Sequence, residues 1–357
     1  MKLPALIAAP LAWIYGLIIN VRHKLFDLKI LRSEEFDIPV VCVGNLTVGG
    51  TGKTPVTEFL IERLSGERRV AVLSRGYRRR TKGFVLSTPR SSVKSIGDEP
   101  KQMKMKYPDV PMAVCEKRAE GIRRLREIHP EIELVILDDA FQHRYVEPWV
   151  NILLMDYNRP VYRDRLLPWG RLRDTRGQID RANFVLVTKC PDDLNPLDMR
   201  IVINSLGLFP YQSLYFTRMR QGEITPLFAD RAVGKVREGD PVIAMSGIAN
   251  PVPLLENLRK RFDVVAELTF DDHHTYRLSD MRRLEALFAA YPDAVVLTTE
   301  KDAVKLTNRK KVPEAVQQRL YYVPIHVSFV ADSESEFLRQ LELYVRTNQK
   351  YSLLHPE

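Results

Sequence analysis

The sequence has little cysteine, with three residues among 357 and no Cys-x-x-Cys pair. Cys42, Cys115 and Cys190 lie in or beside apolar stretches, as small core residues of a protein in a reducing compartment do. This pattern excludes a disulfide scaffold and argues against cysteine ligands for zinc. Internal repeats and low-complexity tracts are also lacking, which excludes a repeat architecture.

Acidic residues are fewer than basic ones, 45 against 54, which gives a formal net charge of +9. The excess is concentrated in residues 68–82 and 159–181, which both fall in apparent loops. Dense basic loops favour an anionic partner, although a solvated surface is the simplest explanation for any single arginine. No aromatic-rich basic repeat accompanies them, so we expect anionic lipid or a phosphorylated substrate as the partner and no nucleic acid.

The amino terminus carries no charge from residue 3 to residue 21, and three basic residues follow. It offers no small-residue cleavage site, which argues against a secretory signal. Pro4 and Pro10 interrupt its first half, while Trp13 and Tyr15 are residues that favour the membrane interface. We therefore expect a helix that lies in or on the cytoplasmic leaflet, with a buried helix packed on the domain as the alternative.

Apolar strand-like runs alternate with helical stretches in the first part of the chain. The runs span residues 40–44, 70–74, 84–87, 111–115, 134–138, 152–156 and 184–188, and the helical stretches span 54–65, 99–107, 116–128 and 191–206. This alternation predicts an α/β fold in which a parallel sheet carries helices on both faces.

The pattern changes after residue 211, where two alternating segments separated by Gln221 and Gly222 predict a β-hairpin. A second α/β series follows, with strands expected at 241–245, 264–269, 294–298 and 321–327 and helices at 253–261, 279–291, 301–306 and 333–346. The length suffices for two domains. The predicted organisation is a membrane-interface helix (1–25), a P-loop domain (26–212), a hairpin linker (213–240) and a smaller α/β domain (241–357).

The segment from Gly44 to Pro55 is the most informative in the chain, because a strand, a glycine-rich turn and a helix follow one another there. Such a loop directs backbone N–H groups and a helix N-terminus at a polyphosphate. The pattern asks for glycine where Thr47 stands, and a glycine-rich turn without nucleotide is the alternative. The residues predicted to bind ATP are Thr47, Val48, Gly49, Gly50, Thr51, Gly52, Lys53 and Thr54, with Lys53 on the β- and γ-phosphates and Thr54 on Mg²⁺.

Several charged clusters stand at the ends of predicted strands. The run 134–137 ends in Asp138 and Asp139, which suit a magnesium site beside the phosphate loop, although one of them could cap a helix. Asp98 begins a predicted helix and is either its cap or a base. In the second series, residues 270–276 and 298–302 follow strands, where a cleft between the domains would place them.

The ordered segments GNLTVGGTGKTP, SRGY, GDEP, DDAFQHR, LLPWGRLRD, FDDHHTY and TTEKDAVK resemble the tetraacyldisaccharide 4'-kinases, the lipid A 4'-kinases of Gram-negative bacteria. No single segment is specific, but the ordered set covers nearly the whole chain. The resemblance implies transfer of the ATP γ-phosphate to the 4'-hydroxyl of a tetraacyl glucosamine disaccharide 1-phosphate, giving lipid IVA. It also implies a peripheral or monotopic enzyme at the cytoplasmic face of the inner membrane.

The same resemblance implies roles for single residues. Lys53 and Asp139 act in catalysis, and Thr54, Asp138 and Asp139 hold the metal. Asp98 activates the sugar hydroxyl together with His273, although the neighbouring His274 leaves that assignment open by one position. Asp174 stands where the family often has glutamate, so its direct contact with metal is open. The residues expected at the lipid substrate are Arg75, Tyr77, Gln142, His143 and Arg171.

Two other classes of protein remain as alternatives. A membrane-surface switch or partitioning ATPase would also carry a phosphate loop, but such proteins often have lysine where this chain has Val48. A nucleic-acid-dependent ATPase is suggested only by the net charge. ATP hydrolysis without lipid would indicate the first class, and stimulation of ATPase activity by DNA or RNA would indicate the second.

Overall fold

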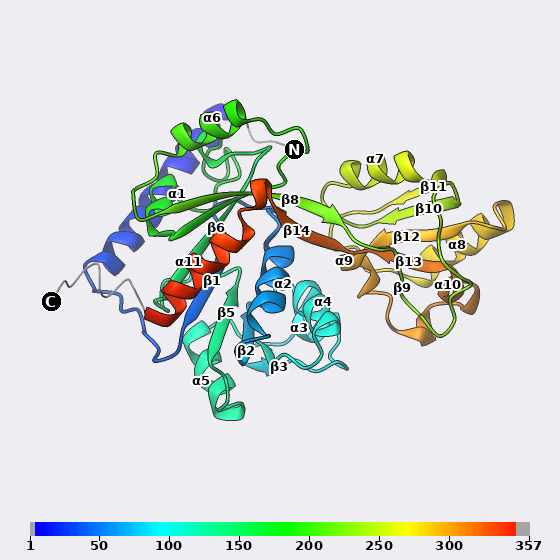
Figure 1. The fold of residues 1–357 in the computed structure, drawn as a ribbon, viewed down its shortest axis with the longest axis horizontal. Helices are drawn as coiled ribbons and strands as arrows, with labels where there is room; N and C mark the ends of the chain where they lie inside the picture. Colours follow the sequence, from blue (N-terminus) through cyan, green and yellow to red (C-terminus); the bar gives the residue numbers. More distant parts are fainter. Residues whose placement is uncertain (1–3, 348–357) are drawn as a thin grey trace.

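A computed structural model describes residues 4–347, which form two α/β domains joined by a pair of long strands (Figure 1). The first domain contains a nine-stranded sheet in the order β14-β8-β7-β6-β1-β5-β2-β4-β3. The second domain contains a five-stranded sheet in the order β11-β10-β12-β13-β9. The predicted α/β class, with a parallel core sheet, is confirmed.

The first sheet is parallel except at its two edges, where β3 and β14 run antiparallel to their neighbours. Its central strands are buried on both faces, which explains why they read as continuous apolar runs. The strands are β1 (Val40–Asn45), β2 (Val70–Ser74), β3 (Val85–Leu86), β4 (Met112–Val114), β5 (Leu134–Asp138), β6 (Val150–Asp156), β7 (Phe184–Thr188), β8 (Ser213–Gln221) and β14 (Ile325–Phe329).

Helices cover both faces of this sheet, and each face has its own apolar core. On one face, Phe59, Met103 and Phe337 share a core from α2 (Lys53–Leu64), α4 (Asp98–Lys106) and α11 (Glu334–Thr347). On the other, Ile122 and Val202 share a core from α5 (Arg118–Ile128) and α6 (Pro196–Leu206). Short helical pieces lie in the loops: α3 (Val93–Ile96), η1 (Val161–Arg163), η2 (Arg176–Arg181) and η4 (Val330–Asp332).

The amino-terminal helix α1 (Ala5–Asp27) continues through Pro10, which the sequence analysis expected to interrupt it. Proline removes one backbone hydrogen bond from a helix, but the helix continues on both sides of Pro10. In the described chain this is the one helix long and apolar enough to cross a membrane, with a mean hydropathy of 1.6 and little of its surface buried. Trp13 is 70% exposed on it, whereas Ala8 and Ala12 pack inward.

The second domain packs helices on both faces of its smaller sheet. The helix α8 (Leu278–Ala290) shares one core with α10 (Glu314–Arg319), and α7 (Val252–Arg261) packs into a separate core. The short α9 (Glu300–Ala303) and η3 (Arg309–Lys311) complete it. The strands are β9 (Thr225–Pro226), β10 (Pro241–Ser246), β11 (Asp263–Thr269), β12 (Val295–Thr299) and β13 (Leu320–Val323).

The hairpin predicted at residues 213–228 does not form. Its first strand, β8, pairs antiparallel with β14, which lies about a hundred residues further along the chain, while β9 pairs with β13 in the second sheet. The expected strand 321–327 is split at Pro324, so that β13 stays in the second sheet and β14 enters the first. The linker is therefore the β8–β14 ribbon, visible between the two domains in Figure 1.

The predicted unit 241–357 is also wrong at its carboxyl end. Phe337, Leu341 and Val345 of α11 are buried in the same core as Phe59 and Phe184 of the first domain. Apolar spacing along α11 predicts a helix, but it does not say which sheet the helix will cover. The second domain is thus inserted between β8 and β14, and the chain returns to the first domain before it ends.

Candidate active site

The predicted phosphate loop connects β1 to α2, as expected, and its backbone is shaped by two glycines with positive φ. Gly49 has φ 106° and Gly52 has φ 83°. The positive φ requires glycine at Gly52, whereas the methyl carbon of Met219, 2.3 Å from where a Cβ would stand, is the flexible end of a side chain that can move aside. Lys53 and Thr54 form the first turn of α2, whose N-terminus faces the loop.

Neighbouring segments hold the loop from outside. The Val48 N–H donates to the Arg171 carbonyl at 2.8 Å, which joins the loop to the basic segment that follows β6 and η1. The Asn45 amide donates to Thr51 Oγ1 at 2.6 Å, and the Thr188 hydroxyl donates to the Thr51 carbonyl at 2.8 Å. These contacts prearrange the loop and use one of its N–H groups, that of Val48.

Lys189 is a contact that the sequence analysis missed. Its Nζ donates to the Gly50 carbonyl and lies 2.9 Å from Asp156 Oδ2. The available signal was its position directly after β7, because residues at the carboxyl ends of parallel strands meet at one edge of the sheet.

Lys53 and Asp139, both predicted as catalytic, lie together. Lys53 Nζ is 3.8 Å from Asp139 Oδ1, and the Arg173 guanidinium donates to both oxygens of the same carboxylate. Burial alone would raise the pKa of Asp139, but the charges of Lys53 and Arg173 overcome it and lower the pKa to about 2. Burial lowers the pKa of Lys53, and Asp139 opposes that shift. Asp139 is therefore a firmly ionised partner for the loop lysine.

Asp138 is buried at the end of β5 beside the loop helix. It accepts hydrogen bonds from Ser74 Oγ at 3.0 Å and from Thr57 Oγ1 at 3.3 Å. Burial, reinforced by the adjacent charge of Asp139, raises its pKa to about 6. Residues 4–347 contain no cluster of three or more His, Cys, Asp or Glu side chains that could hold a metal alone. The oxygen donors of Thr54, Asp138 and Asp139 suit Mg²⁺, which commonly takes its remaining ligands from phosphates and water.

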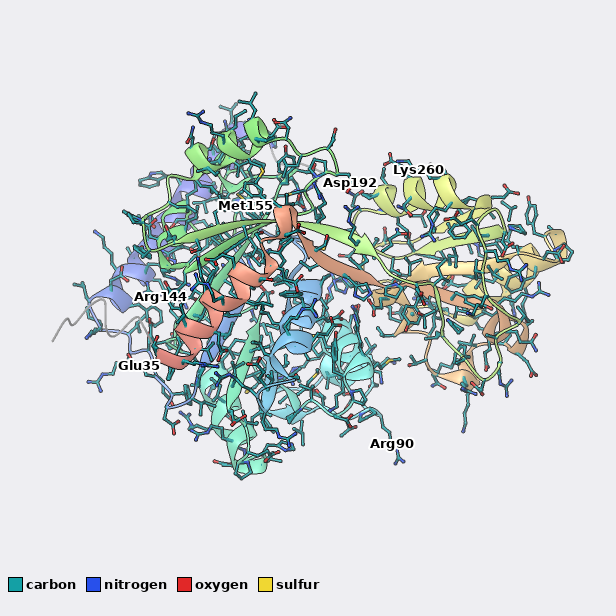
Figure 2. The ribbon with its side chains drawn as sticks, in the orientation of Figure 1. Glu35, Arg90, Arg144, Met155, Asp192 and Lys260 are labelled. Atoms are coloured by element: carbon teal, nitrogen blue, oxygen red, sulfur yellow. The ribbon has the colours of Figure 1, made fainter. Side chains whose placement is uncertain are left out.

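Asp174, predicted as a further metal ligand whose direct contact was left open, pairs with the amino-terminal helix. Its Oδ1 accepts a hydrogen bond from His23 Nε2 of α1 at 2.7 Å, and both side chains are buried. Arg144, labelled in Figure 2, donates to His23 Nδ1 at 3.2 Å, so the ring proton lies on Nε2. Within the described chain, no hydrogen bond or ion pair joins Asp174 to Thr54, Asp138 or Asp139. This carboxylate anchors the amino-terminal helix.

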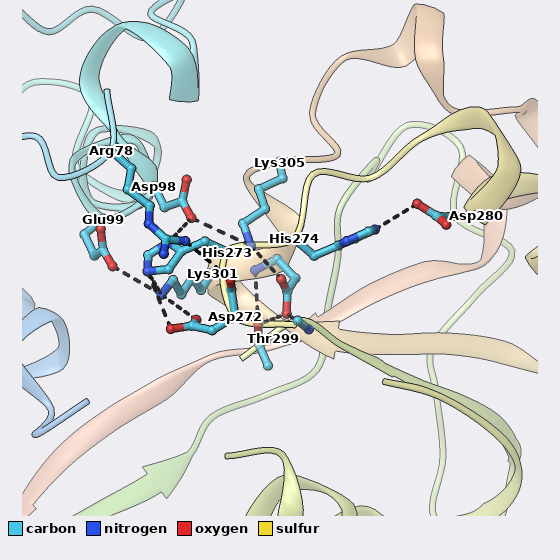
Figure 3. A network of polar contacts seen from close by, with 12 residues as sticks. Arg78, Asp98, Glu99, Asp272, His273, His274, Asp280, Thr299, Lys301 and Lys305 are labelled. Atoms are coloured by element: carbon cyan, nitrogen blue, oxygen red, sulfur yellow. Dashed lines mark hydrogen bonds and ion pairs between the residues drawn. The ribbon is translucent and has the colours of Figure 1, made fainter. Parts of the chain in front are cut away.

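The pair predicted to activate the hydroxyl comes together across the two domains. His273 Nδ1 lies 2.8 Å from Oδ2 of Asp98, the first residue of α4, whereas His274 Nε2 contacts Asp280 at 2.9 Å (Figure 3). The choice between the two histidines is thus His273 by geometry. Burial opposes ionisation of Asp98, but the hydrogen bond from His273 and the nearby lysines lower its pKa overall.

The ammonium group of Lys301 adds a further charge beside the Asp98–His273 pair. Its Nζ lies 3.3 Å from His273 Nε2, 3.2 Å from Asp272 Oδ1 and 3.3 Å from Glu99 Oε1. Because lysine can only donate, Nε2 accepts and the ring proton lies on Nδ1, directed at Asp98. The segment 298–302 was expected near the cleft, and here it reaches the Asp98–His273 pair.

The residues predicted at the substrate divide into two groups. The Gln142 amide donates to the Asn45 carbonyl at 2.8 Å, and His143 Nε2 accepts from the Arg118 N–H at 3.3 Å. Burial and neighbouring arginines lower the pKa of His143 to about 4, so its ring is neutral at pH 7. Both side chains thereby support the segment that follows Asp139.

The other three predicted substrate residues, Arg75, Tyr77 and Arg171, have exposed side chains. The Tyr77 ring lies 5.7 Å from that of His273, beside the pair with Asp98. Within residues 4–347 no hydrogen bond or ion pair engages the Arg171 side chain, while its N–H donates to Asp164 Oδ1 at 3.1 Å and its carbonyl accepts from Val48.

A groove of about 480 Å³ separates α1 from the loop that follows β6. Ala12 and Trp13 line it on the helix side, and Leu166, Trp169 and Leu172 line it on the loop side. The Arg165 guanidinium stacks on the Trp169 ring at 3.6 Å. The groove thus combines apolar walls with a cationic rim, and it lies next to the segment that holds the phosphate loop.

A P-loop on a parallel sheet, an acidic pair beside its lysine and an Asp–His pair supplied by two domains together define a P-loop kinase. The model of the family described as tetraacyldisaccharide-1-P 4'-kinase matches residues 4–344. This chain belongs to that family, which confirms the family predicted from the sequence.

Relatives resemble the chain over nearly their whole lengths. The tetraacyldisaccharide 4'-kinase of Phocaeicola vulgatus is 45% identical over 350 residues, covering 96% of each chain. That of Flavobacterium johnsoniae is 39% identical over 349 residues, covering 98% of this chain and 99% of its own. The crystal structure of LpxK from Aquifex aeolicus in complex with ATP has a TM-score of 0.73 at 28% identity, covering 94% of this chain and 98% of that one.

Proposed function

We propose that this chain transfers the γ-phosphate of ATP to the 4'-hydroxyl of a tetraacyl glucosamine disaccharide 1-phosphate, giving lipid IVA. The observation that carries the proposal is the contact of Asp98 with His273 across the domains, in a chain of this family. The charge of Glu99 contributes slightly to the pKa of both Lys53 and Asp138, so the first turn of α4 lies near the phosphate loop. A hydroxyl held at Asp98 therefore meets the phosphate end of the nucleotide.

ATP is the donor, and residues 47–54 bind its phosphates. The N–H groups of the loop and the N-terminus of α2 contact the phosphate oxygens, while Lys53 neutralises charge on the β- and γ-phosphates. Asp139, itself paired with Arg173, holds the loop lysine in place. A magnesium ion held by Thr54, Asp138 and Asp139 supplies further neutralisation of the phosphate charge when it is bound.

Asp98 is the base that accepts the proton of the sugar hydroxyl. A carboxyl with the ordinary aspartate pKa of 3.8 is ionised at pH 7, as a proton acceptor must be, and the surroundings of Asp98 lower its pKa further. His273 orients the carboxylate and reaches it only when the two domains are in contact, which couples activation of the acceptor to exclusion of water.

The acceptor is an anionic glycolipid, and the chain works on the cytoplasmic face of the inner membrane as a peripheral or monotopic protein. The exposed apolar surface of α1 favours insertion at the membrane interface, followed by basic residues that favour anionic lipid. The groove between α1 and residues 164–176 offers apolar walls to acyl chains, and Arg75, Tyr77 and Arg171 offer polar contacts to the headgroup.

The test is ATP-dependent phosphorylation of the disaccharide 1-phosphate by the whole chain in detergent micelles. Lys53→Ala and Asp98→Asn should each lose most of the activity, with Asp98→Asn retaining ATP affinity because Asp98 acts on the acceptor and not on the nucleotide. Lys310→Met, on the exposed η3 segment, is the matched control and should keep the wild-type rate. Full activity in Lys53→Ala, or equal ATP hydrolysis with and without the lipid, would overturn the proposal.

A further inference from the structure

Lys305 lies at the Asp98–His273 pair, and the proposed reaction has so far given it no role. Its Nζ is 3.7 Å from Asp98 Oδ2, although the two residues belong to different domains. The Lys305 side chain is only 6% exposed, in contrast to the many surface arginines of this chain. Burying an ammonium group costs free energy unless it is paired, so a buried lysine at this position requires a partner.

The pairing is supplied by Asp302, whose side chain is 0% exposed. Asp302 Oδ1 accepts from Lys305 Nζ at 2.9 Å. Its Oδ2 accepts from the Gly247 N–H at 2.8 Å and from the Thr299 hydroxyl at 2.7 Å. Asp302 is therefore fixed by two strand ends of the second domain and in turn fixes the ammonium group that faces Asp98 (Figure 3).

Both contacts with Asp98 fall on the same oxygen. His273 Nδ1 and Lys305 Nζ each approach Oδ2, and within residues 4–347 no hydrogen bond or ion pair reaches Oδ1. A carboxylate whose one oxygen is held from two directions has its other oxygen in a defined position. Resting on the proposed function, we infer that Lys305, held by Asp302, is a positioning residue that fixes Asp98 so that Oδ1 receives the hydroxyl proton.

In the reaction, the hydroxyl oxygen bonds to the γ-phosphorus, the bond from that phosphorus to ADP breaks, and the proton passes to Oδ1. Lys305 donates no proton and touches no reacting atom. Its charge favours the ionised form of Asp98 as well as its orientation. The other charged groups around Asp98 are His273 and Lys301 from the second domain and Glu99 from its own helix, with Asp272 and Asp302 behind the two lysines.

Lys301 does not share this role, although the two lysines are four residues apart. Its ammonium group contacts Glu99 and Asp272 and the far nitrogen of His273, and it makes no ion pair with Asp98. The charge of Lys301 also lowers the pKa of Asp98, but its ammonium group contacts the histidine, whereas Lys305 makes the ion pair with the carboxylate. Removal of Lys305 should therefore change the position of Asp98 as well as its charge environment.

The test compares Lys305→Met and Lys305→Arg with the wild-type chain and with Lys310→Met. We expect kcat of Lys305→Met to fall at least about tenfold with KM for ATP unchanged, because the lost contact acts on the base and not on the nucleotide. The acid limb of kcat/KM should move to higher pH, since an unpaired Asp98 is protonated more easily. Lys305→Arg should restore the wild-type pH limb, and Lys310→Met should match the wild type throughout.

A purely structural role would lower the amount of folded protein without moving the pH limb, and that result overturns the inference. A wild-type rate and pH profile in Lys305→Met overturns it as well. If Lys305→Met does not fold, Lys305→Gln is measured in its place with the same expectations. Asp98→Asn, assayed alongside, distinguishes the role of Lys305 from the role of Asp98 as the base. If Asp98→Asn is inactive and Lys305→Met is unaffected, only the role of Lys305 is refuted. If Asp98→Asn is fully active, the proposed base is refuted.

Discussion

Glu58→Gln should make this protein more stable at pH 8 and leave it unchanged at pH 5. Glu58 is a buried residue of α2 whose Oε2 lies 2.8 Å from Lys106 Nζ. The same ammonium group lies 3.8 Å from Glu62 Oε1 and 3.9 Å from Glu300 Oε1, the latter from the second domain. One lysine therefore lies within 4 Å of three carboxylates. These four side chains together carry excess negative charge where the two domains meet.

The sign and size of the effect follow from proton linkage. Burial, with repulsion from Glu300, raises the pKa of Glu58 from 4.5 to about 7, although Lys106 opposes the shift. Between these two values the folded state binds more protons than the unfolded state, so the free energy of unfolding falls as pH rises. The full shift corresponds to about 3 kcal/mol. Because glutamine loses part of the contact with Lys106, we expect a gain of about 1–2 kcal/mol at pH 8.

The assay is urea unfolding of the whole chain, followed by far-ultraviolet circular dichroism at pH 5, 6, 7 and 8. Glu62→Gln is the matched control: its side chain contacts the same lysine but is 37% exposed, so its profile should stay within about 0.5 kcal/mol of the wild type. A Glu58→Gln variant that is less stable than the wild type by the same amount at every pH would refute the reasoning. That outcome would mean that the ion pair with Lys106 outweighs the burial of the charge.

Two further predictions concern α1. His23→Leu leaves Asp174 as a buried carboxylate without its histidine, so we expect a loss of about 3–5 kcal/mol in the free energy of unfolding and faster proteolysis within α1. The double variant with Asp174→Asn should recover part of that loss, and no recovery would count against the pairing. Leu17→Glu, at a position 51% exposed on α1, should weaken binding to anionic phospholipid vesicles at least about tenfold. Ile128→Glu, at a position 48% exposed on α5, is the control in co-sedimentation, and equal losses in both variants would exclude α1 as the membrane contact.

Local patterns predicted most of the elements. The expected helix 54–65 is Lys53–Leu64, and the expected helix 279–291 is Leu278–Ala290, because apolar spacing and strand-to-helix alternation are properties of neighbouring residues. The expected strand 134–138 matches β5 for the same reason. Among the site residues, the phosphate loop was recognisable because strand, glycines and helix lie in one short segment.

The errors share a physical cause, which is dependence on residues far away in the chain. β8 pairs with β14, and no local sequence pattern in either segment predicts this pairing. The resemblance placed Asp174 at the metal and left its direct contact open, and nothing in the sequence pointed to its partner His23, which lies 151 positions earlier. Lys305 stood inside a segment quoted for the resemblance, but only the docking of one domain against the other shows that it faces Asp98.

The register of the β8–β14 ribbon indicates where the second domain can be deleted from the chain. Gln221 lies opposite Ile325, and the Gly222 N–H donates to the Pro324 carbonyl at 2.9 Å. The chain thus leaves and re-enters the first domain at one point, and residues 222–324 occupy the place of a hairpin turn. An Asn-Gly turn would close the same two strands without moving them. We therefore expect that a chain in which such a turn replaces residues 222–324 keeps the phosphate loop and α1 and loses His273, which donates to Asp98.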